Sequence, residues 1–138
     1  MVMKGSCSCS NIEITWHVID RSFIPRACQC DYCISKSAAY VSKSGTRFEV
    51  GIHSRRLHNT IRQSSNSAVF HECANCKQLV FVTWEKADEV FGALNSIHLN
   101  NTHGFSPPLK VDFSSQTLRE KQDRWQKNWC SPVIIKPL

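Results

Sequence analysis

The residues best suited to chemistry in this 138-residue chain are its eight cysteines, seven of which fall into three tight groups. Thiolates are ligands for zinc and other soft metal ions, and they are also nucleophiles. The groups are Cys7 and Cys9, then Cys28, Cys30 and Cys33, then Cys73 and Cys76. This clustering favours metal ligation, and it leaves only Cys130 outside the groups.

The first and third groups together offer four thiols. Residues i and i+2 of a strand point the same way, so Cys7 and Cys9 can reach one ion together. A Cys-x-x-Cys turn, here Cys73 to Cys76, supplies two more sulfurs from the other side. Four thiolates make a closed structural zinc site that contributes directly to folding. We therefore predict a zinc that fastens the N-terminal strand to a hairpin in mid-chain.

The middle group offers three thiols, Cys28, Cys30 and Cys33, with no obvious fourth ligand. Three protein ligands and one exchangeable position are typical of a catalytic or substrate-binding zinc. Such an ion can hold an incoming thiol as its thiolate. Two alternatives stay open: Cys130 or a histidine completes a second structural site, or the three thiols bind metal only weakly.

The segments around these groups alternate in a way that predicts short strands separated by turns. Ile12, Ile14, Trp16 and Val18 would share one buried face. We expect strands over residues 11–18, 37–42, 47–52, 60–63, 68–72, 77–85 and 109–113. Residues 37–42 and 47–52 flank a turn, and so do residues 60–63 and 68–72.

One helix is expected, near the C-terminus. The sequence from Thr117 to Glu120 fits a capping box. Leu118, Trp125 and Trp129 would then share one helical face. The tail after Pro132 is expected to be irregular. The fold class is therefore mainly β with a short C-terminal helix, in one domain over residues 1–138.

The composition indicates the class of protein and the compartment in which we expect it. Hydrophobic residues make up 41% and charged residues 20%, which fits a folded chain rather than a disordered one. No apolar run is long enough to cross a bilayer, and the first residues carry no apolar signal segment. We therefore expect a cytoplasmic protein whose cysteines are mostly reduced. Its oligomeric state does not follow from the sequence.

The net charge of +6 favours an anionic partner. Lysines and arginines are scattered, and Arg55-Arg56 is the one adjacent pair, so nucleic-acid binding is disfavoured. The basic residues considered as partners for substrate carboxylates are Arg26, Lys36, Arg55 and Arg56.

Several further residues have a functional and a structural interpretation. Tyr32 and Asp31 either tune the three-thiol site or shape its loop. His71 lies either beside a metal site or in ordinary strand packing. We assign Trp16, Phe81 and Trp84 to the core, and we expect Cys130 to be a free thiol near a frayed end.

Taken in order, the cysteine motifs resemble the glutathione-dependent formaldehyde-activating enzymes, a family that includes the centromere protein V relatives. The likeness spans roughly residues 5–85 and rests on three motifs in the family's order and spacing. These motifs are Gly5-Ser-Cys7-Ser-Cys9, Cys28-Gln-Cys30-Asp31-Tyr-Cys33 and Phe70-His71-Glu-Cys73-Ala-Asn-Cys76.

The resemblance implies a fold of several coiled β-sheets, like that of methionine sulfoxide reductase B. It implies two zinc ions, a structural one on Cys7, Cys9, Cys73 and Cys76 and a catalytic one on Cys28, Cys30 and Cys33. It also implies a carbon–sulfur lyase type of activity that joins glutathione to formaldehyde. A non-catalytic zinc module and a thiol or metal sensor of the same fold are the alternatives.

The chain departs from the family pattern at three places. Lys77 stands where a glycine usually follows the Cys-x-x-Cys, and Ser8 stands where histidine is common. A step that usually contains glycine reads Lys36-Ser37-Ala38. None of these changes removes a thiol. They bear on the shape of the substrate pocket.

Overall fold

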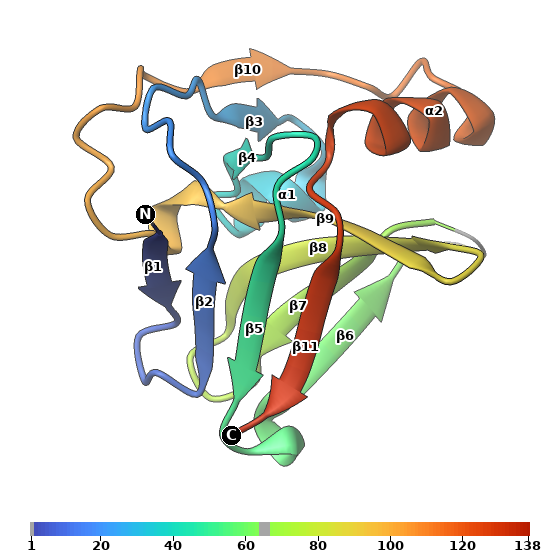
Figure 1. Cartoon of the computed structure of the whole chain (residues 1–138). Helices are drawn as coiled ribbons and strands as arrows, with labels where there is room; N and C mark the ends of the chain where they lie inside the picture. The colour runs from blue at the N-terminus through green and yellow to red at the C-terminus, as the bar shows by residue number, and fades with distance from the viewer. Residues whose placement is uncertain (1, 64–66) are drawn as a thin grey trace.

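The computed structural model describes residues 2–63 and 67–138, and the strands in these residues form two sheets. The smaller sheet has four strands, in the spatial order β1 (Met3–Ser6), β2 (Ile12–Trp16), β5 (Phe48–Ile52) and β11 (Val133–Pro137). Its neighbours run antiparallel except β5 and β11, which are parallel. Figure 1 shows this sheet in front of the strands of the larger one.

The larger sheet has seven strands. Their spatial order is β10 (Leu109–Val111), β3 (Arg26–Cys28), β4 (Tyr40–Val41), β9 (Glu89–Asn95), β8 (Gln78–Lys86), β7 (Val69–Cys73) and β6 (His58–Arg62). β10 and β3 are parallel, and the other neighbours are antiparallel. The helical elements are α1 (Asp31–Ser35), α2 (Leu118–Asn128) and the 3-10 turns η1 (Arg55–Leu57) and η2 (Ser96–His98).

The core lies between the two sheets. Trp16 and Phe48 from the smaller sheet and Phe81 from the larger one are fully buried. The rings of Phe48 and Phe81 meet edge to face with centroids 6.0 Å apart, a favourable aromatic geometry. The expected alternation holds in β2, where Ile12, Ile14 and Trp16 are buried. The assignment of Trp16, Phe81 and Trp84 to the core is confirmed.

The mainly β fold with one C-terminal helix is confirmed. The hairpin of β6 and β7 forms as expected, although residues 64–66 of its loop lie outside the described residues. Strands also form within residues 37–42 and 47–52. They do not pair with each other, because β4 joins β9 in the larger sheet and β5 joins β2 in the smaller one.

Two expectations about the C-terminus are wrong. The tail after Pro132 is not irregular: it forms β11, which pairs in parallel with β5 from Val133 opposite Phe48. Cys130 is a free thiol, but it is fully buried rather than near a frayed end. The backbones of Cys130 and Gly92 exchange hydrogen bonds of 2.8 and 2.9 Å, which tie this segment to β9.

Helix α2 begins where its capping box predicts. The Thr117 hydroxyl accepts from the Glu120 amide at 3.1 Å, and the Glu120 carboxylate accepts from the Thr117 amide at 2.9 Å. Trp125 and Trp129 face inward and stack with centroids 5.0 Å apart, and Trp125 also packs on Trp84. In the part of the chain that the structure describes, no helix is long and apolar enough to span a membrane.

Candidate metal centres and the adjoining cavity

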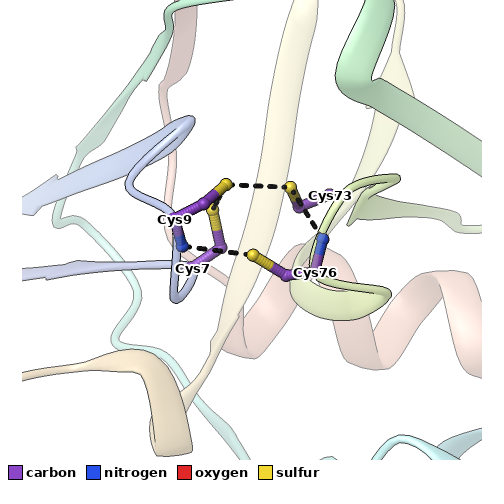
Figure 2. Close-up of side chains that lie close together, drawn as sticks. All are labelled: Cys7, Cys9, Cys73 and Cys76. Carbon is purple, nitrogen blue, oxygen red and sulfur yellow. Dashed lines mark hydrogen bonds between the residues drawn. The ribbon is translucent and has the colours of Figure 1, made fainter.

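The first and third cysteine groups come together as predicted. The sulfurs of Cys7, Cys9, Cys73 and Cys76 all lie within 4.8 Å of one another, as Figure 2 shows. Cys73 is the last residue of β7, and Cys76 lies in the turn that follows. Cys7 and Cys9 lie in the turn after β1 and not on a strand, so the convergence comes from two facing turns rather than from strand alternation.

The distances in this four-thiol group fit a metal tetrahedron. Cys9 Sγ lies 3.8 Å from Cys7 Sγ and 3.6 Å from Cys73 Sγ. Zinc–sulfur bonds of about 2.3 Å in a tetrahedron place sulfurs about 3.8 Å apart, whereas a disulfide needs about 2.05 Å. The donor set is therefore one that suits zinc, and these two distances are compatible with it.

Backbone amides support negative charge in the four-thiol group. The amide of Cys9 donates to Cys76 Sγ at 3.1 Å, and that of Ile12 donates to Cys7 Sγ at 3.4 Å. Hydrogen bonds lower the pKa of Cys9 to about 6, and the largest effect comes from the side chain of Asn75. Burial raises the pKa of Cys7. Such donors to ligand sulfurs orient them and stabilise their thiolate form.

The middle group also converges, with Cys28, Cys30 and Cys33 offering sulfurs within 4.8 Å of one another. Cys28 ends β3, Cys30 caps the N-terminus of α1, and Cys33 lies inside that helix. Among the described residues, no other cysteine, histidine or carboxylate joins this group. Cys130 is elsewhere, where its sulfur accepts from the Thr46 hydroxyl at 3.5 Å.

The three sulfurs differ in exposure and in proton affinity. Cys33 is buried, whereas Cys30 is exposed. A hydrogen bond from Cys33 lowers the pKa of Cys28 to about 5, and the same contact raises the pKa of Cys33. Cys28 is therefore the more acidic thiol of this pair and Cys33 the less acidic one. The Tyr40 hydroxyl lies 3.2 Å from Cys33 Sγ, and burial raises its pKa, so it stays protonated.

A cavity of about 610 Å³ opens beside the three-thiol group, and all three thiols line it. Its size is within the range of about 300–1,000 Å³ that is usual for small-molecule sites. Its other walls are largely aromatic and basic. They include Tyr40, Phe70, Phe113, Trp125, Arg26 and Arg124.

The four basic residues considered as partners for substrate carboxylates lie in different places. Arg26 lines the cavity, but Lys36 instead pairs with Glu72 at 3.5 Å. Arg55 and Arg56 are exposed in η1 and do not line the cavity.

Sequence reasoning missed two basic residues of the cavity, Lys121 and Arg124 of α2. Their helical spacing was the available signal. They lie three and six residues after Leu118, which faces the cavity, so they fall on or beside the same face of the helix.

A polar bridge connects the two thiol groups. Tyr32 in α1 donates its hydroxyl to the buried carboxylate of Glu72, which directly precedes Cys73. The Lys36 ammonium reaches the same carboxylate and donates to the Lys77 carbonyl at 3.2 Å. The loop that carries the three thiols is thus held against the turn that carries Cys73 and Cys76.

Two other residues near the thiols have structural positions. His71 is buried, with its ring stacked on Phe81 and its Nε2 2.7 Å from the Thr83 hydroxyl, so it serves strand packing. Asp31 is exposed in the first turn of α1, where a carboxylate favours the helix N-terminus.

The family's glycine positions keep their backbone shape without glycine. Lys77, after the Cys-x-x-Cys, has φ +57°, and Ser37, after α1, has φ +54°. Both angles lie in the left-handed region that glycine adopts most readily. The backbone at Lys77 and Ser37 thus has a conformation that glycine would also adopt, while the side chains beside the thiols differ.

The two converging thiol groups and the two-sheet fold define a cysteine-rich, mainly β protein whose thiols could hold metal ions. The chain belongs to the glutathione-dependent formaldehyde-activating enzyme family, whose sequence pattern matches residues 2–114. No curated protein sequence matches it significantly. Among solved structures, the chain is similar to a crystal structure of a Rhodobacter sphaeroides protein, with a TM-score of 0.56 and 19% identity. That match covers 78% of this chain and 100% of the other, and it concerns the fold alone.

Proposed function

We propose that this protein joins a thiol cosubstrate such as glutathione to a small aldehyde such as formaldehyde, a carbon–sulfur lyase type of reaction in the synthetic direction. One observation carries the proposal. Three thiols, with no fourth metal-binding side chain among the described residues, line a cavity of about 610 Å³ and stand apart from a closed group of four. Family membership supports the same activity.

We assign two zinc ions to the chain. Cys7, Cys9, Cys73 and Cys76 would hold a structural ion, because four thiolates leave no position open. Cys28, Cys30 and Cys33 would hold the catalytic one, with its remaining position facing the cavity. A zinc ion held there by three thiolates would keep the cosubstrate thiol, bound at the fourth position, deprotonated and nucleophilic at neutral pH.

The reaction is an addition. The thiol first releases its proton to water. The thiolate sulfur then forms a bond to the carbonyl carbon as the π electron pair moves to oxygen, and that oxygen takes a proton from water, so the two proton transfers balance. The Tyr40 hydroxyl, protonated and beside Cys33, is a hydrogen-bond donor in the cavity wall. Holding thiol and aldehyde together in one cavity removes much of the entropic cost of their meeting.

The test is the rate of hemithioacetal formation from glutathione and ¹³C-labelled formaldehyde, followed by exchange NMR. We expect a rate above the uncatalysed one for the wild type and the uncatalysed rate for Cys30→Ser. Cys130→Ala removes a thiol outside both groups and should keep the wild-type rate. Equal rates for the wild type and Cys30→Ser would contradict the proposal.

We also propose that residues 1–138 act as one domain in the cytoplasm. All eight cysteines are free thiols, which supports a reducing compartment. The shared core cluster, with residues from both sheets, supports a single folding unit. Nucleic acid and membrane are not among the partners that we propose.

A further inference from the structure

The cavity beside the three thiols is completed by a part of the chain that the family pattern does not cover. The match ends at residue 114, and α2 begins at Leu118. From α2 and its C-terminal cap residue, the cavity is lined by Leu118, Lys121, Arg124, Trp125 and Trp129. The features of this wall therefore belong to this chain rather than to the pattern of its family.

Two arginines that line the cavity, Arg26 of β3 and Arg124 of α2, have neutral hydrogen-bond partners among the residues described. Arg26 donates to the Ser42 hydroxyl at 2.8 Å, and Arg124 donates to the Gln116 amide oxygen at 2.5 Å. The guanidinium carbon of Arg124 also lies 3.4 Å from the ring centroid of Phe113. In the described ranges, neither guanidinium forms an ion pair with a carboxylate.

The two charges are close enough to act on each other. Burial and the neighbouring charge of Arg26 lower the pKa of Arg124 to about 10. Two half-buried cations facing one cavity favour negative charge beside them. The Cys28 sulfur is one such charge, since Arg124 helps to lower the pKa of Cys28. Asp112 also lines the cavity, but it is exposed and its carboxylate accepts from the Ser114 amide at 2.9 Å.

Both arginines are held in place. The Ser42 hydroxyl that accepts from Arg26 donates in turn to the Asn128 carbonyl at the end of α2. Arg124 is fixed between Phe113 and Gln116. A planar guanidinium held in this way is suited to bind a carboxylate through paired hydrogen bonds.

We propose that Arg124 of α2 and Arg26 of β3 together bind one carboxylate of the thiol cosubstrate, so that α2 selects acidic thiols over neutral ones. The thiol then lies at the Cys28, Cys30 and Cys33 end of the cavity, and the carboxylate lies at the arginine end. This inference rests on the proposed function, since it takes the bound molecule to be a thiol. It identifies Arg26 and Arg124 as the residues that determine which thiol binds.

The experiment compares glutathione with its diethyl ester, which keeps the thiol and removes the negative charge of both carboxylates. KM is measured by the formaldehyde assay, and Kd by calorimetric titration of the metal-loaded protein. For the wild type, we expect esterification to raise both constants roughly ten- to one-hundred-fold, the usual effect of a charge-assisted hydrogen bond. For Arg124→Met, the acid and the ester should bind about equally.

Arg119→Met is the matched control, because Arg119 lies on the same helix with its side chain 86% exposed. It should keep the wild-type preference for the acid. A wild type that binds acid and ester equally, or an Arg124→Met variant with an unchanged preference and an unchanged near-UV spectrum, would overturn the inference. If no thiol reacts at all, the proposed function fails, whereas the titration still decides the carboxylate site.

Discussion

Two single residues beside the thiol groups hold backbone angles that suit glycine better. Lys77 follows Cys76 with φ +57°, and Ser37 follows α1 with φ +54°. A left-handed conformation costs a residue with a side chain about 1–2 kcal/mol. These positions shape the turn that holds Cys76 and the end of the helix that holds Cys33, so local strain lies next to both groups.

Replacing Lys77 with glycine should therefore stabilise the metal-loaded protein. We expect a gain of about 1 kcal/mol, or roughly 3 °C in Tm, because relief of the strain exceeds the extra entropy of an unfolded glycine. Differential scanning calorimetry measures this shift. Lys110→Gly, at an exposed position in β10, should instead lower Tm, since glycine weakens a strand. A lower Tm for Lys77→Gly would contradict the strain argument.

At the scale of elements, the capping box controls how firmly α2 closes the cavity. Replacing Thr117 with alanine removes the acceptor for the Glu120 amide. Loss of such a cap costs about 1 kcal/mol. We expect faster hydrogen exchange of the α2 amides, with the two sheets unaffected. Ser115→Ala, at an exposed position just before the helix, is the control and should leave exchange unchanged.

A second prediction at this scale concerns the polar bridge of Tyr32, Glu72 and Lys36 between the two thiol groups. Glu72→Gln keeps the size of the side chain but removes the charge that Lys36 pairs with. Because this bridge positions the three-thiol loop, zinc affinity there should fall about tenfold, as is usual for residues that orient metal ligands. Competition with a chromophoric chelator measures it. Glu85→Gln, on an exposed part of β8, should leave the affinity at its wild-type value.

The sequence predicted those helices and strands whose stabilising interactions involve neighbouring residues. The alternation in β2 and the capping box of α2 are written in neighbouring residues, and both were predicted correctly. Strand β11 was missed because its partner β5 lies about 85 residues earlier in the chain. The short helix α1 was missed because its N-terminal cap is the Cys30 sulfur, not one of the usual capping residues.

The thiol groups were predictable for a similar reason. Their spacing gave the members of each group, which the structure brings together. The composition of the cavity did not follow from the sequence, because Arg26 and Arg124 line one cavity only once α2 has packed against β9. The two arginines are about 100 residues apart in the sequence, so their place in one cavity is visible only in the folded molecule.

For the whole molecule, the four-thiol group is a joint between the two sheets. Cys7 and Cys9 follow β1 of the smaller sheet, whereas Cys73 ends β7 of the larger one. Structural zinc contributes about 10–16 kcal/mol in small zinc proteins, comparable with or larger than the 5–15 kcal/mol stability of a typical domain. We therefore expect metal bound at this joint to decide whether the sheets stay packed.

Removing metal from the four-thiol group should unfold the protein. We expect Cys9→Ser, or excess strong chelator acting on the wild type, to abolish the near-UV signal of the buried tryptophans. Circular dichroism measures the change, and restored zinc should reverse it in the chelated wild type. Cys130→Ala should retain the signal in the absence of chelator. A native near-UV spectrum after complete metal removal would show that packing alone holds the two sheets together.

We propose that the chain carries two metal sites of different character, one closed and one open to the cavity. The most direct test is zinc content per chain, on protein purified without added metal, before and after Cys30→Ser. We expect two zinc ions in the wild type and one in Cys30→Ser, with the near-UV spectrum unchanged. One zinc ion in the wild type, unaffected by the substitution, would mean that Cys28, Cys30 and Cys33 hold no metal, and it would contradict the account.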